Sequence, residues 1–288
     1  MLARVSAYVA LTKPRIIELL LITTLPTMIL AKGGLPDVWL MIATLLGGTL
    51  AAGGANAINM YVDRDIDKLM HRTAKRPLVT GVIAPRNALI FAITLEVVAF
   101  VELWAWVNLL SAVLAVSATL FYVFVYTLWL KRTSRQNIVI GGAAGAVPVL
   151  VGWAAVTNSL SWTPVVMFAI IFVWTPPHFW ALAFKYKDDY EAAHVPMMPV
   201  VATFRRTATE IMAYTLVMVA LTLVLAPVAH LGTLYVVSAA LLGAGFIAMA
   251  VRLWLQATPK ASMQLFSYSI TYLTLLFVVM AVDVFVQR

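Results

Sequence analysis

The sequence predicts an all-α protein that crosses a membrane nine times. Of its 288 residues, 63% are hydrophobic and only 11% are charged, and the mean hydropathy is +0.95. This is more apolar surface than one water-soluble core can hide. Nine apolar stretches are each long enough to span a bilayer as a helix, and lysines and arginines gather in every second connection between them. We therefore expect a polytopic membrane protein.

The nine predicted spans follow one another along the whole chain. In order, they cover roughly residues 14–32, 38–60, 87–107, 109–130, 137–156, 162–184, 207–229, 233–256 and 265–285. Four connections are short, namely KGGLPD, the WVN region, TNSLS and HLGT. Two others, residues 61–86 and 185–206, are long and polar and hold half of the twelve acidic residues. Long polar loops between packed spans are where functional residues usually collect.

The distribution of positive charge predicts the orientation. With a cytoplasmic N-terminus, 18 of the 20 lysines and arginines lie on the cytoplasmic side, and only Lys32 and Arg288 lie opposite. The positive-inside rule therefore favours a cytoplasmic N-terminus and a periplasmic C-terminus. The net charge of +8 is mostly a topology signal and does not indicate nucleic acid binding. The first apolar run reads as a retained span and no transit peptide precedes it, so we expect a multi-pass protein of a bacterial inner membrane.

The positions of the two long loops predict an internal repeat. They follow the second and sixth spans, so both should emerge on the cytoplasmic face. We therefore expect one domain, residues 1–288, with four-helix halves at about 10–131 and 136–256 and a ninth helix at about 265–285. In the fifth span, Gly141 and Gly145 form a small-xxx-small pattern that favours close helix packing.

A stripe of three polar residues is the strongest sign of chemistry. Asn59, Asp63 and Asp67 are four residues apart, which places them on one face of a helix where an apolar run meets the polar loop. Carboxylates stacked in this way repel one another unless a cation lies between them. Mg²⁺ binds through one or two carboxylates plus phosphate oxygens, so the stripe predicts a site for Mg²⁺ and a phosphorylated ligand with an apolar tail. The alternative is a solvated helix end.

Basic residues and a second acidic loop support this interpretation. The second loop reads FKYKDDYEAAHVPMMPV, in which Asp188 and Asp189 follow two lysines. Asp65 points to another face of the first loop, and Arg64 is a candidate to reach phosphate oxygens. With Asn59, the candidate phosphate ligands are Arg15, Lys68, Arg72, Arg76, Lys131, Lys185 and Lys187, and Lys13 and Arg132 are further cationic candidates.

The segment TPPHFW places two prolines inside the sixth span. Proline lacks a backbone N–H, so Pro176 and Pro177 should kink the helix and free carbonyl groups where helices line a cavity. His178 follows directly and is a candidate iron ligand or hydrogen-bonding group, although a lone histidine in an apolar helix is more often structural. The chain has no cysteine, which excludes disulfides and thiolate nucleophiles.

These segments resemble the UbiA-type intramembrane prenyltransferases, whose first aspartate motif has the form N-x-x-x-D-x-x-x-D. More narrowly, NMYVDRDIDKLMHRTAKRPL, LTKPRI, NIVIGGAAGAVPVLVGW and WTPPHFWALAFKYKDDY with VPMMPV resemble the haem O synthases, or protoheme IX farnesyltransferases. The resemblance covers nearly the whole chain. It implies nine helices around a central cavity in which two acidic motifs hold Mg²⁺ and a prenyl diphosphate. The second motif departs from the D-x-x-x-D form, because Lys185 stands four residues before Asp189.

The resemblance also implies the reaction. The farnesyl group of farnesyl diphosphate would be transferred to a vinyl group of haem B with addition of water, giving haem O for terminal oxidases and releasing diphosphate. The implied cofactor is Mg²⁺, and the candidate handover partners are a haem A synthase or terminal oxidase assembly proteins. The resemblance carries over Asn59, Asp63 and Asp67, which match the first motif by position. Together with the candidates above, we expect Asn59, Asp63, Arg64 and Asp67 to be catalytic, Asp63, Asp67, Asp188 and Asp189 to be the metal ligands, and His178 to bind haem.

Two other functions stay open at this point. One is prenyl transfer to a quinone precursor or another aromatic acceptor. The other is transport, because broken helices and intramembrane charges also occur in carriers. The carboxylates gather at one face of the membrane, whereas a carrier usually holds its ion near the midplane, so the sequence favours the enzyme.

Overall fold

A computed structural model describes residues 2–287, and every regular element in this range is helical. In chain order the elements are α1 (Leu2–Thr12), α2 (Pro14–Lys32), α3 (Val38–Val62), the short 3₁₀ helix η1 (Ile66–Lys68), α4 (Pro85–Trp106), α5 (Leu109–Leu120), the π-helix η2 (Phe121–Leu130), α6 (Lys131–Thr133), α7 (Asn137–Thr157), α8 (Trp162–Lys185), α9 (Lys187–Ala192), α10 (Met198–Val201), α11 (Phe204–Val228), α12 (Thr233–Gln256) and α13 (Pro259–Val286).

Eight helical segments of the described chain are long and apolar enough to cross a membrane, counting the continuous run 109–133 as one. They match the last eight of the nine predicted spans. The first predicted span corresponds to α2, whose apolar stretch is shorter, Leu20–Lys32, because Arg15 and Glu18 lie in its first two turns. The all-helical membrane fold is thus confirmed, whereas the count of nine crossings and the orientation stay predictions.

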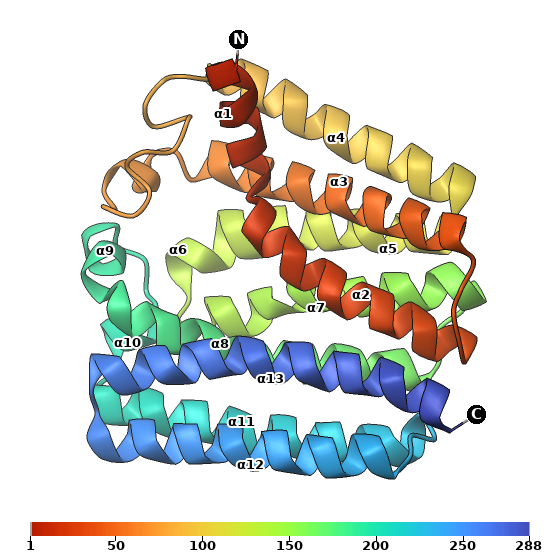
Figure 1. The fold of residues 1–288 in the computed structure, drawn as a ribbon. Coiled ribbons are helices and arrows are strands. Elements are labelled where there is room, and N and C mark those ends of the chain that lie inside the picture. The colour runs from red at the N-terminus through yellow and green to blue at the C-terminus, as the bar shows by residue number, and fades with distance from the viewer. Residues whose placement is uncertain (1, 288) are drawn as a thin grey trace.

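The helices lie side by side as a bundle, with the loops gathered at its two ends (Figure 1). Helices α3 and α4 form one edge, α11, α12 and α13 form the opposite edge, and α2, α7 and α8 lie between them. The long loop after α3 and the short helices α9 and α10 are at the same end, on the left of the view, and the C-terminus is at the other end. This arrangement brings the two long polar loops together, as the sequence predicts.

Of the two glycines predicted to allow close helix packing, one does so in the structure. A Cβ added at Gly141 would lie 2.3 Å from a ring carbon of Tyr126, so α7 packs there directly against η2. The prediction for Gly145 is wrong, because a Cβ at that position would meet open space. The second close approach involves Gly142, where an added Cβ would lie 2.9 Å from Thr175 of α8. The fifth span therefore packs on both sides through neighbouring glycines, not through one face.

Two acidic residues of α4 face the neighbouring helix α3. Glu96 accepts a hydrogen bond from Thr119 Oγ1 at 3.1 Å and lies against Gly54. Glu102 is buried against Gly47, and neither of its carboxylate oxygens has a hydrogen-bond partner among the described residues. Both carboxylates therefore point into the bundle, as expected for acidic groups in a membrane span.

Helix N-termini at both ends of the bundle are capped by side chains. The side chains of Asp37, Asn108, Thr203 and Thr258 each accept a hydrogen bond from a backbone N–H one turn later in α3, α5, α11 and α13. Helix α12 has no such cap of its own. Instead, the buried Asp283 of α13 accepts from the backbone N–H groups of Gly232 at 2.7 Å and Tyr235 at 3.1 Å. One carboxylate therefore joins the C-terminal helix to the start of α12.

Replacement of Asp283 should lower the thermal stability of the protein. Asp283→Ala leaves two N–H groups of a helix terminus without partners, and each buried unsatisfied donor costs about 1–3 kcal/mol. Asp283→Asn keeps one accepting oxygen and should have a smaller effect. The measurement is thermal unfolding of detergent-purified protein followed by tryptophan fluorescence. Equal midpoints for wild type and Asp283→Ala would contradict the capping role.

Candidate active site

The predicted polar stripe forms where α3 ends. Asp63 N donates to Asn59 O at 2.9 Å, and Asp67 N donates to Asp63 O at 2.8 Å. The second bond continues the helical turn past Val62, the last residue of α3, into η1. All three side chains are buried, and the two aspartates have 0% exposure. The expected shared face is therefore present, and it points into the protein instead of into solvent.

Each buried aspartate is paired with a cation from another segment. Lys131 Nζ donates to Asp63 Oδ2 in a short ion pair, and Arg76 Nη1 lies 2.6 Å from Asp67 Oδ2. Arg132 Nη2 lies 3.8 Å from Asp63 Oδ1 and makes its close contacts, at 2.7 Å, with the exposed Asp65. These pairs offset the cost of burying two carboxylates side by side.

One oxygen of each aspartate is left for another ligand. Asp63 Oδ1 and Asp67 Oδ1 are buried and accept no hydrogen bond from the described residues. Unpaired buried carboxylate oxygens are costly, and they suit a hard cation such as Mg²⁺. Among residues 2–287, no group of three or more His, Cys, Asp or Glu side chains is arranged to hold a metal ion by itself. A bound Mg²⁺ would therefore take its remaining ligands from phosphate and water oxygens, which is its usual preference.

Asn59 connects this pair to two further segments. Its Nδ2 donates to Asp63 Oδ2 at 2.8 Å and to Thr127 Oγ1 at 3.1 Å, while its Oδ1 accepts from Lys13 Nζ at 2.8 Å. Lys13 lies between α1 and α2 with a left-handed backbone, φ 53°. The amide thus holds a lysine from the start of the chain beside the two carboxylates.

The π-helix η2 places Thr127 and Lys131 at the site. Thr127 Oγ1 donates to the carbonyl of Tyr122, five residues earlier, at 2.8 Å. The rings of Tyr122 and Tyr126 stack with centroids 5.3 Å apart. π-helical turns are rare in proteins, but those that occur are frequently at functional sites. Their wider turn changes which residues face inward. Sequence reasoning missed Thr127, since nothing in FYVFVYTLWL distinguishes a π-helix from an α-helix.

The second acidic loop contacts the first through Asp189. The buried Asp189 accepts from the backbone N–H groups of His71 at 2.9 Å and Arg72 at 3.2 Å. Asp188 is exposed. The structure therefore brings the two loops together, and it gives Asp189 a role in holding the first loop. A metal-binding role for Asp188 and Asp189 stays a prediction.

The remaining predicted cations lie around the loops without touching the aspartates. The Arg72 guanidinium lies over the ring of Tyr190, 4.9 Å from its centroid. Arg64 is turned back onto its own helix end, where it donates to Tyr61 O at 2.6 Å. The exposed members of the predicted set are Arg15, Lys68, Arg72, Lys185 and Lys187.

The electrostatic surroundings shift two groups outside the spans. Burial, followed by the positive charges of Arg76 and Lys131, lowers the pKa of the Lys13 ammonium to about 7. The hydrogen bond from Arg132 lowers the pKa of the Asp65 carboxyl to about 2. Lys13 therefore changes charge near neutral pH, while Asp65 stays ionised.

His178 occupies a separate aromatic cluster in α8. It is buried, its Nδ1 lies 2.7 Å from Ser269 Oγ of α13, and its ring stacks on Trp174 and Phe266. Helix α8 is continuous through Pro176 and Pro177, and the kink there stays a prediction. Among the described residues, no hydrogen bond or ring contact joins His178 to the aspartate pair.

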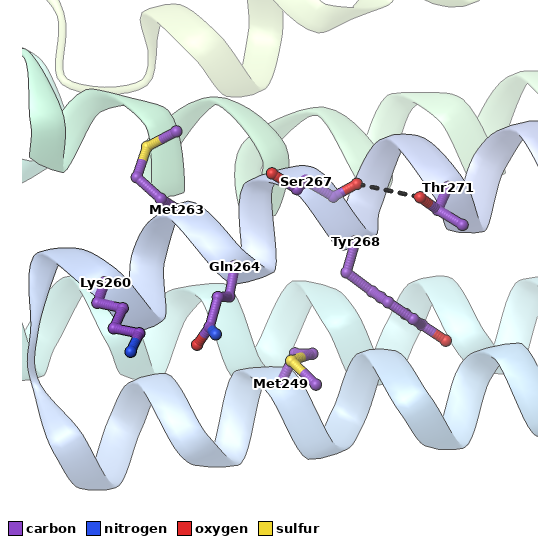
Figure 2. Close-up of a pocket in the computed structure, with 7 residues that line it drawn as sticks. All are labelled: Met249, Lys260, Met263, Gln264, Ser267, Tyr268 and Thr271. Carbon is purple, nitrogen blue, oxygen red and sulfur yellow. Dashed lines mark hydrogen bonds between the residues drawn. The ribbon is translucent and has the colours of Figure 1, made fainter.

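A groove of about 520 Å³ lies on the C-terminal helix pair, and none of the predicted site residues lines it (Figure 2). Helix α12 contributes Met249, and α13 contributes the other lining residues, which are Lys260, Met263, Gln264, Ser267, Tyr268 and Thr271. The groove is open to the surroundings of the bundle and contains no acidic residue, so it does not provide a metal site.

Comparisons with known proteins agree with this geometry. The model of the UbiA prenyltransferase family matches residues 20–278. Protoheme IX farnesyltransferase of Renibacterium salmoninarum is 52% identical over 289 residues, which cover 99% of this chain and 91% of the relative. The protein of the same name from Parafrankia sp. is 56% identical over 281 residues, covering 96% and 90%.

Solved structures share the fold at low sequence identity. A structure of digeranylgeranylglyceryl phosphate synthase has a TM-score of 0.81 at 16% identity and covers 98% of this chain and 99% of its own. A UbiA homologue from Archaeoglobus fulgidus bound to GPP and Mg²⁺ has a TM-score of 0.65 at 17% identity, with 95% and 99% covered. The bundle, the match along residues 20–278 and the close relatives lead to one conclusion: the chain belongs to the UbiA prenyltransferase family.

Proposed function

We propose that the protein transfers the farnesyl group of farnesyl diphosphate to a vinyl group of haem B, with addition of water, and that it requires Mg²⁺. The choice of haem B as acceptor is supported by two proteins named protoheme IX farnesyltransferase. Their sequences are 52% and 56% identical to this chain over nearly its whole length. The diphosphate and the metal are supported by the buried aspartate pair, in which one oxygen of each carboxylate accepts no hydrogen bond.

The residues of the site supply charge and position instead of a nucleophile. When bound, Mg²⁺ would neutralise charge on the diphosphate and stabilise it as a leaving group. Asp63 Oδ1 and Asp67 Oδ1 are the oxygens that would hold the ion. Lys131 and Arg76 lie on the opposite oxygens of the same carboxylates, within reach of an incoming diphosphate. Asn59 holds Lys13 beside them as a third positive group.

The bond changes follow from this arrangement. The bond between farnesyl C1 and its diphosphate oxygen breaks, and the diphosphate keeps the electron pair. The π-electrons of the haem vinyl group form the new carbon–carbon bond to C1, which leaves a cation on the haem side chain. A water oxygen adds to that cation, and one proton is released. Cationic side chains act most strongly here because the site is buried and excludes most water.

The remaining assignments are proposals of the same kind. We place Arg64, Lys68, Arg72, Lys185, Lys187 and Arg15 around the diphosphate or the haem propionates, and Asp188 and Asp189 near a second part of the metal site. We also propose the two four-helix halves, the bacterial inner membrane as location, and handover of the product to a haem A synthase or terminal oxidase assembly protein. A carboxylate pair at one end of the bundle favours an enzyme over a carrier.

One experiment tests both which acceptor is prenylated and whether the two aspartates are required. Purified protein with farnesyl diphosphate and Mg²⁺ should convert haem B to haem O, detected by mass spectrometry, and should leave 4-hydroxybenzoate unchanged. Asp63→Asn and Asp67→Asn should each lose at least about 100-fold in turnover, since even outer-shell changes at metal sites cost 10–100-fold.

Asp65→Asn is the matched control, because Asp65 is an exposed aspartate of the same loop paired with Arg132. It should stay within about threefold of the wild type, as expected for a surface ion pair. Prenylated 4-hydroxybenzoate as the main product would overturn the haem assignment. Wild-type turnover by Asp63→Asn would overturn the metal assignment.

Asp189→Asn should loosen the first polar loop. Its amide can accept only one of the two backbone bonds that the carboxylate accepts from His71 and Arg72. Amide hydrogen exchange at these two residues should become faster, and the KM for farnesyl diphosphate should rise. Asp188→Asn should leave both exchange rates unchanged, because Asp188 is exposed. Equal protection in Asp189→Asn and the wild type would contradict this role.

Diphosphate binding should depend on pH through Lys13. Because the pKa of Lys13 is lowered to about 7, its ammonium loses its proton as pH rises through that value. Above that pH, Lys13 must take up a proton when a ligand that needs the cation binds. The Kd of a non-hydrolysable farnesyl diphosphate analogue should therefore rise by up to about tenfold per pH unit. Lys13→Arg should remove this dependence, because arginine stays charged. Matching pH profiles for the two proteins would exclude Lys13.

A further inference from the structure

The hydrogen bonds of Ser269 determine which nitrogen of His178 carries a proton. Ser269 Oγ lies 2.6 Å from the carbonyl oxygen of Phe266 and 2.7 Å from His178 Nδ1. A carbonyl oxygen can only accept, so the single hydroxyl proton of Ser269 is donated to Phe266 O. Toward His178 the hydroxyl must then accept. The proton of the neutral imidazole is therefore on Nδ1, and Nε2 carries a free lone pair.

Aromatic contacts hold this ring in place. Trp174 stacks on it with centroids 4.2 Å apart and planes 19° apart, and Phe266 stacks at 4.7 Å and 30°. Two rings cannot share one face of an imidazole at these distances, so they cover both faces. Trp174 is itself fixed, since its Nε1 donates to the backbone carbonyl of Ser269 at 2.9 Å. Phe179 meets the ring at 87° with centroids 5.2 Å apart, so new contacts to His178 are restricted to the edge of its ring.

His178 is 7% exposed, and its one hydrogen bond among the described residues is the bond of Nδ1 to Ser269. The lone pair of Nε2 is therefore free to bind a ligand. Histidines that bind metal almost always donate their other ring N–H to a fixed acceptor, which sets the tautomer and the ring orientation. The arrangement of Nδ1, Ser269 and the aromatic rings has this form.

We propose that His178 Nε2 is an axial ligand to the iron of the haem substrate, and that Ser269 is a positioning residue that fixes the required tautomer. This inference rests on the proposed function and adds a specificity to it. The acceptor would be recognised as an iron porphyrin through its metal, not only through its ring and propionates. A metal-free porphyrin would then bind without the contribution of His178.

The test is spectroscopic binding of haem B to the purified full-length protein. Wild-type protein should give the ferric Soret and electron paramagnetic resonance signature of a nitrogen ligand. His178→Ala should lose it, and added imidazole should restore it by filling the vacated space. Restoration requires a folded protein, so it separates lost ligation from misfolding. Metal-free protoporphyrin IX should bind wild type and His178→Ala equally.

Ser269→Ala tests the positioning role and keeps the backbone carbonyl that Trp174 uses. It should weaken haem binding by about 10–100-fold, as changes next to metal ligands do. Ser269→Thr retains a hydroxyl and should restore most of the affinity. The matched control is Ser262→Ala, because Ser262 is a buried serine of the same helix that donates to the carbonyl of Pro259 at 2.8 Å and has no histidine partner. Its haem affinity should equal that of the wild type.

Two results would overturn the proposal. One is an identical haem spectrum in wild type and His178→Ala. The other is an equal loss of affinity in Ser262→Ala and Ser269→Ala. Failure of the proposed function would give a different result. Wild-type protein would then show the nitrogen-ligand spectrum with haem B but form no haem O, which would support the ligation by His178 and exclude the reaction.

Discussion

The burial of two like charges is the constraint on which the rest of the site depends. Asp63 and Asp67 have no exposed surface, and two unpaired carboxylates in that position would prevent folding or lose their charge. Arg76 of the same loop offsets Asp67, and Lys131, 68 residues further along the chain, offsets Asp63. The loop after α3 and the end of η2 are therefore both fixed by the aspartates.

Much of this arrangement could be predicted because it depends on local patterns. Apolar length and loop charge located eight spans within a few residues, and the four-residue spacing predicted the stripe. The first span was harder, since Arg15 and Glu18 shorten its apolar part although α2 begins at Pro14. Long-range contacts were beyond such patterns. Asp189 bonds to the backbone of residues more than a hundred positions earlier, and Asp283 caps a helix that is not its own.

Helix α13 takes part in two of these long-range contacts, through Ser269 and through Asp283. Asp283 joins it to the start of α12, and Ser269 joins it to the proline-containing part of α8. The two prolines make TPPHFW recognisable in the sequence, but the partner of His178 lies about ninety residues later in the chain. A single sequence cannot show which serine of α13 that is, because Ser262 and Ser269 both make the same local bond to a carbonyl.

The π-helix has a consequence for how this protein can vary. The wide turns of η2 set the rotation at which α6 leaves it, so Lys131 and Thr127 reach Asp63 and Asn59 only while ten consecutive residues keep that winding. A return to ordinary winding would turn the lysine away from Asp63 while leaving the hydrophobicity of the segment unchanged. The contact of Lys131 with Asp63 thus constrains the length and winding of this helix. This constraint is tighter than the one set by the thickness of a bilayer.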